Sequence, residues 1–194
     1  MTYCKRLLTP LLTSLTMALV LSPAYADMSL DNSHSTLKFV SIKKGSVAEA
    51  HSINKLSGSL SDKGELKISL DLSSVDTKID IRNERMKKHL FEIDKFATAT
   101  ITAKLTGLPT ADGISQLSAE ATLDLHGVSK PIKVEVSLVK SGDQLMVAST
   151  RPVIINAADY GLEGGIAMLQ KLAKLPSIAT AVPVNFVLVF SATK

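Results

Sequence analysis

The feature that most constrains this chain is a period-two alternation of apolar and polar residues, repeated along the sequence. In residues 117–125 every second side chain is apolar, and residues 64–72, 98–105, 132–138 and 182–190 show the same pattern. Such alternation is typical of strands with one face in an apolar interior and the other in water. A series of these strands favours a closed barrel or a sandwich. A barrel of about eight strands has room for packed side chains or for one small ligand.

The predicted strands number about eight, and turn-forming residues such as Asp-Lys-Gly and Ser-Gly-Asp separate them. They comprise residues 37–44, 48–60, 64–72, 98–105, 114–126, 130–140, 144–156 and 180–192. The pattern therefore predicts an all-β fold, an antiparallel barrel of about eight strands with two short helical insertions.

The two insertions interrupt the series of strands. In residues 75–96, Asp80 is predicted to cap a short helix that runs through Leu90. Residues 159–176 carry an apolar stripe with helical spacing, formed by Ile166, Leu169, Leu172 and Ala173. Three glycines precede or begin this stripe, at 161, 164 and 165. Each helix is a candidate lid or plug over a barrel end, and the alternative is that both simply seal the core.

The first 26 residues have the design of a secretory signal peptide. Lys5 and Arg6 form a charged start, residues 7–21 are mostly apolar, and Ala-Tyr-Ala at 24–26 is a small-x-small cleavage signal. The apolar stretch is short for a membrane span of about 20 residues. We therefore expect residues 1–26 to be removed and residues 27–194 to form one exported domain without a transmembrane segment.

The composition argues against disulfide bonds and against nucleic acid as a partner. Cys4 is the only cysteine and lies in the predicted signal peptide, so no disulfide is expected in the mature chain. The net charge falls from +4 to +2 once Lys5 and Arg6 are removed. The basic residues are scattered and tryptophan is absent, which gives no electrostatic or stacking case for nucleic acid.

Motifs of the common enzyme classes are missing from the sequence. It contains no G-x-S-x-G elbow, no H-E-x-x-H and no phosphate-binding loop, and its four histidines lie far apart. We therefore expect no enzyme, no metal and no cofactor. The predicted inward face instead carries small residues, namely Ala99, Ala103, Ala119 and Ala121. They leave an apolar cavity or belong to a taper filled by alternating small and large neighbours, and the sequence leaves both open.

Five segments in order resemble the YceI-like, polyisoprenoid-binding family. They are Asp-x-x-His-Ser-x-Leu-x-Phe at 31–39, Ser-Val-Asp-Thr through Arg-Asn-Glu-Arg-Met-x-x-His-Leu at 74–90, Lys-Phe-x-x-Ala-Thr-Ile at 95–101, Ala-x-Leu-x-Leu-His-Gly-Val-Ser-Lys-Pro at 121–131, and Asn-x-x-Asp-Tyr-Gly at 156–161. The resemblance implies a lipocalin-like barrel that holds a long isoprenoid chain, and export to the periplasm. The chain departs from the family at Ala157, where a basic residue is usual, and at Lys43-Lys44-Gly45, where His-Leu-Gly is usual.

The expected function is therefore to bind an amphipathic isoprenoid lipid, a quinone or a prenyl phosphate, for carriage or storage in the periplasm. Two alternatives stay open: a stress or assembly adaptor with a filled barrel, and an enzyme that acts on a lipid in the lumen. A location outside the cell and a homodimer are also compatible with the sequence.

Arg85 is the predicted headgroup contact, because it lies in a basic cluster beside apolar residues and matches the family pattern. The alternative is a solvated helix face. The residues expected to contact the ligand, in the lumen and at its mouth, are Phe39, Ile81, Arg85, Met86, Leu90, Phe91, Phe96, Ala99, Ile101, Ala103, Ala119, Ala121, Leu123 and Phe186.

Overall fold

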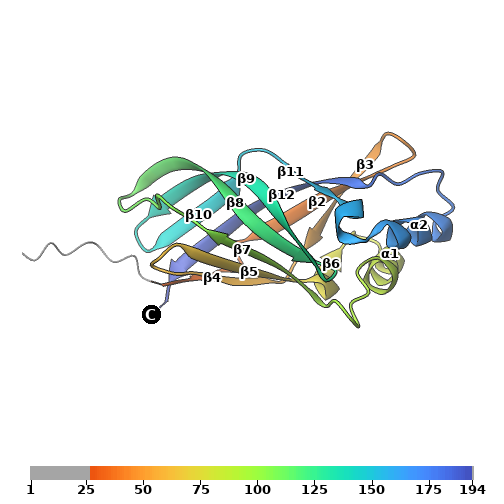
Figure 1. Cartoon of the computed structure of the whole chain (residues 1–194), viewed down its shortest axis with the longest axis horizontal. Helices are drawn as coiled ribbons and strands as arrows, with labels where there is room; N and C mark the ends of the chain where they lie inside the picture. Colours follow the sequence, from red (N-terminus) through yellow and green to blue (C-terminus); the bar gives the residue numbers. More distant parts are fainter. Residues whose placement is uncertain (1–26, 194) are drawn as a thin grey trace, which may run out of the picture.

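The computed structural model describes residues 27–193, so the predicted signal peptide lies outside the described residues. The described chain forms an elongated barrel of strands with helices at one end (Figure 1). Its twelve strands are β1 (Met28–Leu30), β2 (Thr36–Lys43), β3 (Val47–Ile53), β4 (Leu56–Leu60), β5 (Glu65–Asp71), β6 (Val75–Asp76), β7 (Thr98–Lys104), β8 (Gly113–Leu125), β9 (Val128–Ser141), β10 (Gln144–Ser149), β11 (Val153–Asn156) and β12 (Ala181–Ala192).

Eight of these strands form the closed wall. They follow the order β1-β4-β5-β7-β8-β9-β10-β12, and β12 closes the ring by pairing with β1. Each pairing in the ring is antiparallel. The predicted eight-stranded antiparallel barrel is thus confirmed.

The alternation in the sequence sets which side chains point inward. On β8, Ala119, Ala121 and Leu123 are buried, whereas Glu120 and Thr122 between them are exposed. Because cross-strand partners share a face of the sheet, the same inward face continues onto the neighbouring strands. The core therefore lies inside the barrel.

The strand β12 runs the length of the barrel and pairs with two successive strands on each edge. One edge meets β10 and then β11, and the other meets β1 and then β2. The predicted strand 144–156 is therefore two strands, interrupted at residues 150–152, where Pro152 has no N–H to donate. The predicted strand 48–60 is also interrupted, because the N–H groups of Asn54 and Lys55 donate to the Ser74 hydroxyl oxygen.

The first insertion forms the helix α1 (Asp80–Arg85), which continues as the π-helical turn η2 (Met86–Leu90). A short 3₁₀ turn, η1 (Leu72–Ser74), precedes it. The prediction that Asp80 caps this helix is wrong, because Ile79 occupies the capping position and Asp80 is the first helical residue. Asn83 instead accepts hydrogen bonds from the N–H and hydroxyl of Thr77, and so holds the helix against the preceding loop.

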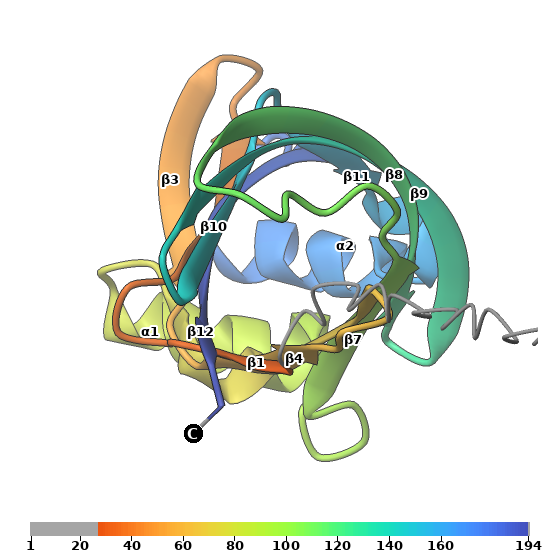
Figure 2. The same cartoon turned by 90° about the vertical axis from the view of Figure 1, so that its left-hand side faces the viewer.

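The second insertion forms the 3₁₀ turn η3 (Ala157–Tyr160) and the helix α2 (Glu163–Leu172), which lies across the far end of the barrel in Figure 2. Of its predicted apolar stripe, Ile166 is buried and Leu169 packs against the core, but Leu172 and Ala173 are exposed because the helix ends there. A Cβ atom at Gly165 would lie 2.5 Å from the carbonyl oxygen of His89. The helix α2 therefore packs on η2 at backbone distance, which requires glycine at that position.

Candidate functional site

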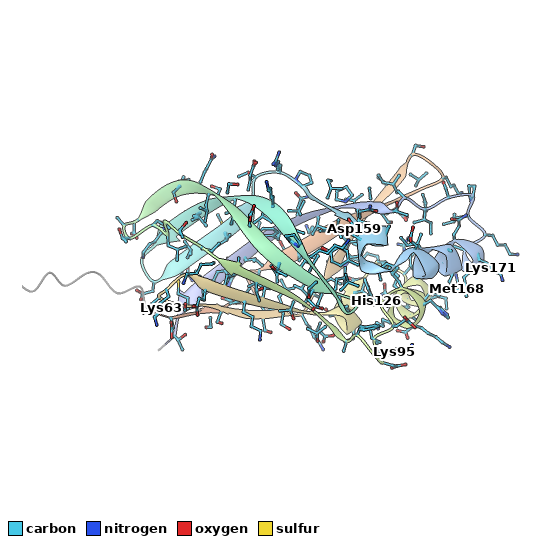
Figure 3. The ribbon with its side chains drawn as sticks, viewed as in Figure 1. Lys63, Lys95, His126, Asp159, Met168 and Lys171 are labelled. Atoms are coloured by element: carbon cyan, nitrogen blue, oxygen red, sulfur yellow. The ribbon has the colours of Figure 1, made fainter. Side chains whose placement is uncertain are left out.

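A cavity of about 200 Å³ lies inside the barrel, and the side chains that line it are all apolar. Leu66 and Leu105 line it near the turn that contains Lys63, at the end opposite the helices (Figure 3). Leu162 and Ile166 line it at the helical end. The cavity therefore extends along the barrel between its two ends.

Small side chains on two neighbouring strands leave this space open. Ala99 and Ala103 on β7 and Ala119 and Ala121 on β8 all line the cavity. Ala103 and Ala121 are direct cross-strand partners, so a small residue stands opposite another small residue. A barrel filled by alternating sizes would place a large side chain opposite a small one. The register therefore favours an open cavity over a filled interior.

Ten of the fourteen residues predicted to contact a ligand line this cavity. They are Phe39, Leu90, Phe91, Ala99, Ile101, Ala103, Ala119, Ala121, Leu123 and Phe186. The structure thus brings these residues together around one space. Their contact with a ligand stays a prediction.

The other four predicted residues lie outside the cavity lining. Ile81 on α1 is 59% exposed, and Met86 is buried in the core. Phe96 packs against His126, with ring centroids 4.4 Å apart. Arg85 is half-buried and forms no ion pair or side-chain hydrogen bond with any residue of the described chain.

Several lining residues were missed from the sequence. Of the 31 residues that line the cavity, 21 were not among the predicted contacts. They include Val153 and Ile155 on β11, Val182 and Val184 on β12, and Ile166 on α2. The period-two pattern in residues 182–190 carries the signal for Val182 and Val184, which alternate with polar or exposed neighbours. The lining role of Ile166 depends on how α2 docks, and no local pattern reveals that.

At the helical end, the inward face of the β2–β3 hairpin changes from apolar to charged. Phe39 lines the cavity, and two residues further along β2 the register pairs Ser41 with Glu49. The Glu49 Oε2 atom lies 2.7 Å from both Lys43 Nζ and Arg82 Nη1. Hydrogen bonds from Lys43 and then Arg82 hold the pKa of Glu49 below its usual value. One carboxylate therefore pairs with two cations, and these three side chains together carry a net charge of +1.

His51 joins this cluster to the cavity wall. Its ring lies 5.2 Å from that of Phe39, and its Nε2 atom lies 2.8 Å from the Ser41 hydroxyl oxygen. The residue is 4% exposed, and its Nδ1 atom has no hydrogen-bond partner among residues 27–193. Burial lowers the pKa of His51, and the nearby Arg82 lowers it further. A neutral imidazole therefore borders the apolar cavity.

Among residues 27–193, no group of three or more His, Cys, Asp or Glu side chains is placed to hold a metal ion. Within the same residues, no helix has the length and apolar character needed to cross a bilayer.

Comparison with protein families gives a match over nearly the whole described chain. A family model described as a YceI-like domain matches residues 28–190. A solved polyisoprenoid binding domain from Saccharophagus degradans, implicated in plant cell wall breakdown, is 42% identical. The alignment covers 86% of this chain and 98% of that chain, with a TM-score of 0.82.

More distant structures share the fold. BcnA from Burkholderia cenocepacia is 17% identical over 82% of this chain and 98% of that chain, with a TM-score of 0.66. A mutant YceI protein of Campylobacter jejuni is 13% identical over 74% of this chain and 85% of that chain, with a TM-score of 0.58. The comparison with curated proteins finds no match.

Proposed function

Because the chain belongs to the YceI-like family, whose model matches residues 28–190, we propose that it binds an amphipathic isoprenoid lipid inside its barrel. The lipid is a quinone or a prenyl phosphate, which the protein carries or stores. The observation that carries the proposal is the cavity of about 200 Å³ with an entirely apolar lining. The 42% identical domain from Saccharophagus degradans, described as polyisoprenoid binding, supports the class of ligand.

Burial of the hydrocarbon tail supplies enough free energy for binding. A prenyl tail of about 20 carbons gains roughly 15 kcal/mol at ~0.8 kcal/mol per buried carbon. Association and ordering offset about 4–15 kcal/mol of this gain. The cavity is smaller than the range of about 300–1,000 Å³ that is common for ligand pockets, so the lining has to move outward around a long tail.

The proposed place of action is the periplasm. The support is the sequence of residues 1–26, in which a charged start, an apolar stretch and Ala-Tyr-Ala follow in the order of a cleavable signal. Expression of the full chain in a Gram-negative host tests this proposal. We expect a periplasmic protein whose intact mass corresponds to a chain that begins at Asp27. A cytoplasmic protein that retains Met1 would contradict it.

A chain-length series tests the lipid proposal. Geraniol, farnesol and geranylgeraniol have the same headgroup and differ by one isoprene unit each, and calorimetric titration gives their affinities. If the tail lies in the cavity, each added unit buries about five more carbons, and we expect at least a tenfold gain per unit. An affinity independent of tail length would contradict binding in the cavity.

The two alternatives make different predictions in the same experiment. An adaptor with a filled barrel binds none of the three alcohols. An enzyme converts a bound lipid, and the product is detected by mass spectrometry of the recovered ligand. The lining offers a bound tail no acid or base, which favours binding without conversion.

A further inference from the structure

The barrel wall has a gap between β9 and β11. The strand β9 pairs with β10 only from Ser141 to Val136, and the last bond in this row runs from the Thr150 N–H to the Glu135 carbonyl oxygen. Beyond that point β9 pairs with β8 alone, and β11 pairs with β12 alone. Among the described strands, no hydrogen-bonded ladder therefore joins β9 to β11.

Two prolines stand on opposite sides of this gap. Pro131 lies on β9, and Pro152 lies immediately before β11. Neither has a backbone N–H, so neither can donate a bond that would close the wall. The sequence therefore disfavours hydrogen bonding across the gap from both sides.

A cleft of about 420 Å³ occupies the gap and borders the interior cavity. The cleft and the cavity share three lining side chains, namely Ile132 on β9 and Val153 and Ile155 on β11. Each of the three is half-buried. Movement of these few side chains would join the outer cleft to the apolar interior without the loss of any strand pairing.

The rim of the cleft is positively charged. Lys130, Lys133 and Arg151 line it, against a single acidic residue, Asp159 on η3 (labelled in Figure 3). Lys130 pairs in register with Leu123, which lines the cavity, so Lys130 belongs to the inward face of β9. Three cations beside an apolar interior match a ligand with an anionic head and a hydrocarbon tail.

The cations of the rim are available to a ligand. Lys130 Nζ lies 3.3 Å from Asp159 Oδ1, and Arg151 Nη2 lies 2.6 Å from Glu135 Oε1, which does not line the cleft. Both pairs are exposed, and exposed ion pairs are weak and exchange partners readily. Lys133 is exposed and has no ion pair within residues 27–193.

Neither end of the barrel offers an equivalent site. At the helical end, Gly165 lies against the backbone of η2. Lys43 and Arg82 both pair with Glu49 there, and their side chains are less exposed than those of Lys130 and Arg151. At the other end, the Leu105 N–H donates to the Gly64 carbonyl oxygen and so ties β7 to the turn beneath it. The gap in the side wall is the weaker barrier.

We infer that the cleft between β9 and β11 binds the anionic phosphate headgroup of a lipid whose tail passes Ile132 and Ile155 into the cavity. The inference rests on the proposed function and specifies its ligand: a prenyl monophosphate or diphosphate in place of a neutral quinone. Arg and Lys side chains bind phosphate oxygens through charge-assisted hydrogen bonds, and Arg151 can do so with two parallel bonds.

Calorimetric titration with geranylgeranyl phosphate, geranylgeraniol and inorganic phosphate tests the inference. The variant Lys130→Gln/Lys133→Gln/Arg151→Gln removes the cations of the cleft. A matched variant, Lys63→Gln/Lys67→Gln/Lys104→Gln, removes three exposed cations near the far end of the barrel. We expect the native protein to bind the phosphate ester at least tenfold more tightly than the alcohol. The cleft variant should lose this preference and keep its affinity for the alcohol, and the matched variant should keep both.

The outcomes separate the two proposals. If the native protein binds neither prenyl compound, the proposed function fails and this inference fails with it. If it binds both with equal affinity, or if the cleft variant keeps the preference, lipid binding stands and the headgroup site is overturned. Inorganic phosphate that binds as tightly as the ester would also overturn it, because the tail would then contribute nothing.

A second measurement uses the native protein, so it does not depend on how the variants fold. Geranylgeranyl phosphate that carries a photoreactive group on the phosphate is cross-linked and mapped by peptide mass spectrometry. We expect label on residues 130–133 and 151–156. Label on residues 82–88 would overturn the inference and place the headgroup beside Arg85.

Discussion

Lys130 and Asp159 form an ion pair of 3.3 Å that links β9 to η3 across the gap in the barrel wall. Asp159 is the one acidic residue that lines the cleft with the three cations. Asp159→Asn should therefore free Lys130 and make the cleft more positive. We expect a several-fold gain in affinity for geranylgeranyl phosphate and no change for geranylgeraniol, measured by titration. The free energy of unfolding should change by no more than about 1 kcal/mol, because the ion pair that is lost is exposed.

Asp143→Asn is the matched control, because it removes an exposed carboxylate from the β9–β10 turn. Its affinity for both compounds should equal that of the native protein. An equal gain in the two variants would mean that overall charge, and not the cleft, attracts the phosphate.

Ala121→Phe tests whether the cavity is open. Ala121 lines the cavity opposite Ala103, so a phenyl ring can occupy the space that a lipid tail would fill. We expect loss of geranylgeraniol binding with a melting temperature close to that of the native protein. Overpacking of a filled core costs ~1–3 kcal/mol, so a large fall in melting temperature would indicate a packed interior. Thr122→Phe, on the outer face of the same strand, should leave lipid binding intact.

Gly164 and Gly165 provide a matched pair for the docking of α2. A Cβ atom at Gly165 would meet the backbone of His89 and Leu90 at 2.5 and 2.8 Å, whereas one at Gly164 would meet nothing within 4 Å. Gly165→Ala should cost ~1–3 kcal/mol of stability and speed hydrogen exchange in α2. Gly164→Ala should instead stabilise the helix by roughly 0.5–1 kcal/mol. Urea denaturation measures both, and equal effects would contradict the close packing of α2 on η2.

His51 makes the stability of the barrel depend on pH. Burial and then Arg82 lower its pKa, so the folded state resists protonation that the unfolded state accepts. Stability is therefore unaffected by this group above the unfolded pKa of about 6.5, and it falls as the pH drops from there toward the lower folded pKa. The free energy of unfolding falls by at most about 1.4 kcal/mol per pH unit through this group.

Urea denaturation at about pH 7.5, 6.5 and 5.5 measures this dependence. These pH values lie above, at and below the ordinary histidine pKa of about 6.5. His51→Gln should flatten the profile below pH ~6.5. His89→Gln, which removes an imidazole that forms no ion pair or side-chain hydrogen bond within residues 27–193, is the control and should keep the native slope. A native slope in the His51 variant would contradict the role of the buried ring.

The alternation of single strands could be predicted from the sequence, but only one of the two interruptions leaves a signal in it. On β10 and β11 the inward side chains Leu145, Val147, Val153 and Ile155 are all odd-numbered, so the pattern continues unchanged across the break at 150–152. At the other break the inward positions change from odd to even between Ile53 and Leu56. That change of parity is a signal for a break within residues 48–60.

The lining of the cavity was largely predictable because it follows strand alternation, whereas the charged groups around it were not. The basic cluster of α1 predicts a headgroup contact at Arg85, but the structure places Arg82 on Glu49, which lies 33 residues earlier in the chain. The cleft between β9 and β11 depends on a pairing that is missing between distant strands. Local periodicity reports which way a side chain points and contains no information on such long-range partners.

The most direct test of the account is to identify what the protein holds when it is isolated from the periplasm of a Gram-negative host. Native mass spectrometry gives the mass of the intact complex, and an organic extract of the same sample identifies the ligand. We expect a one-to-one complex with an isoprenoid lipid in the native protein, and no such complex in Ala121→Phe. A native protein that is free of lipid and indistinguishable from Ala121→Phe would contradict it.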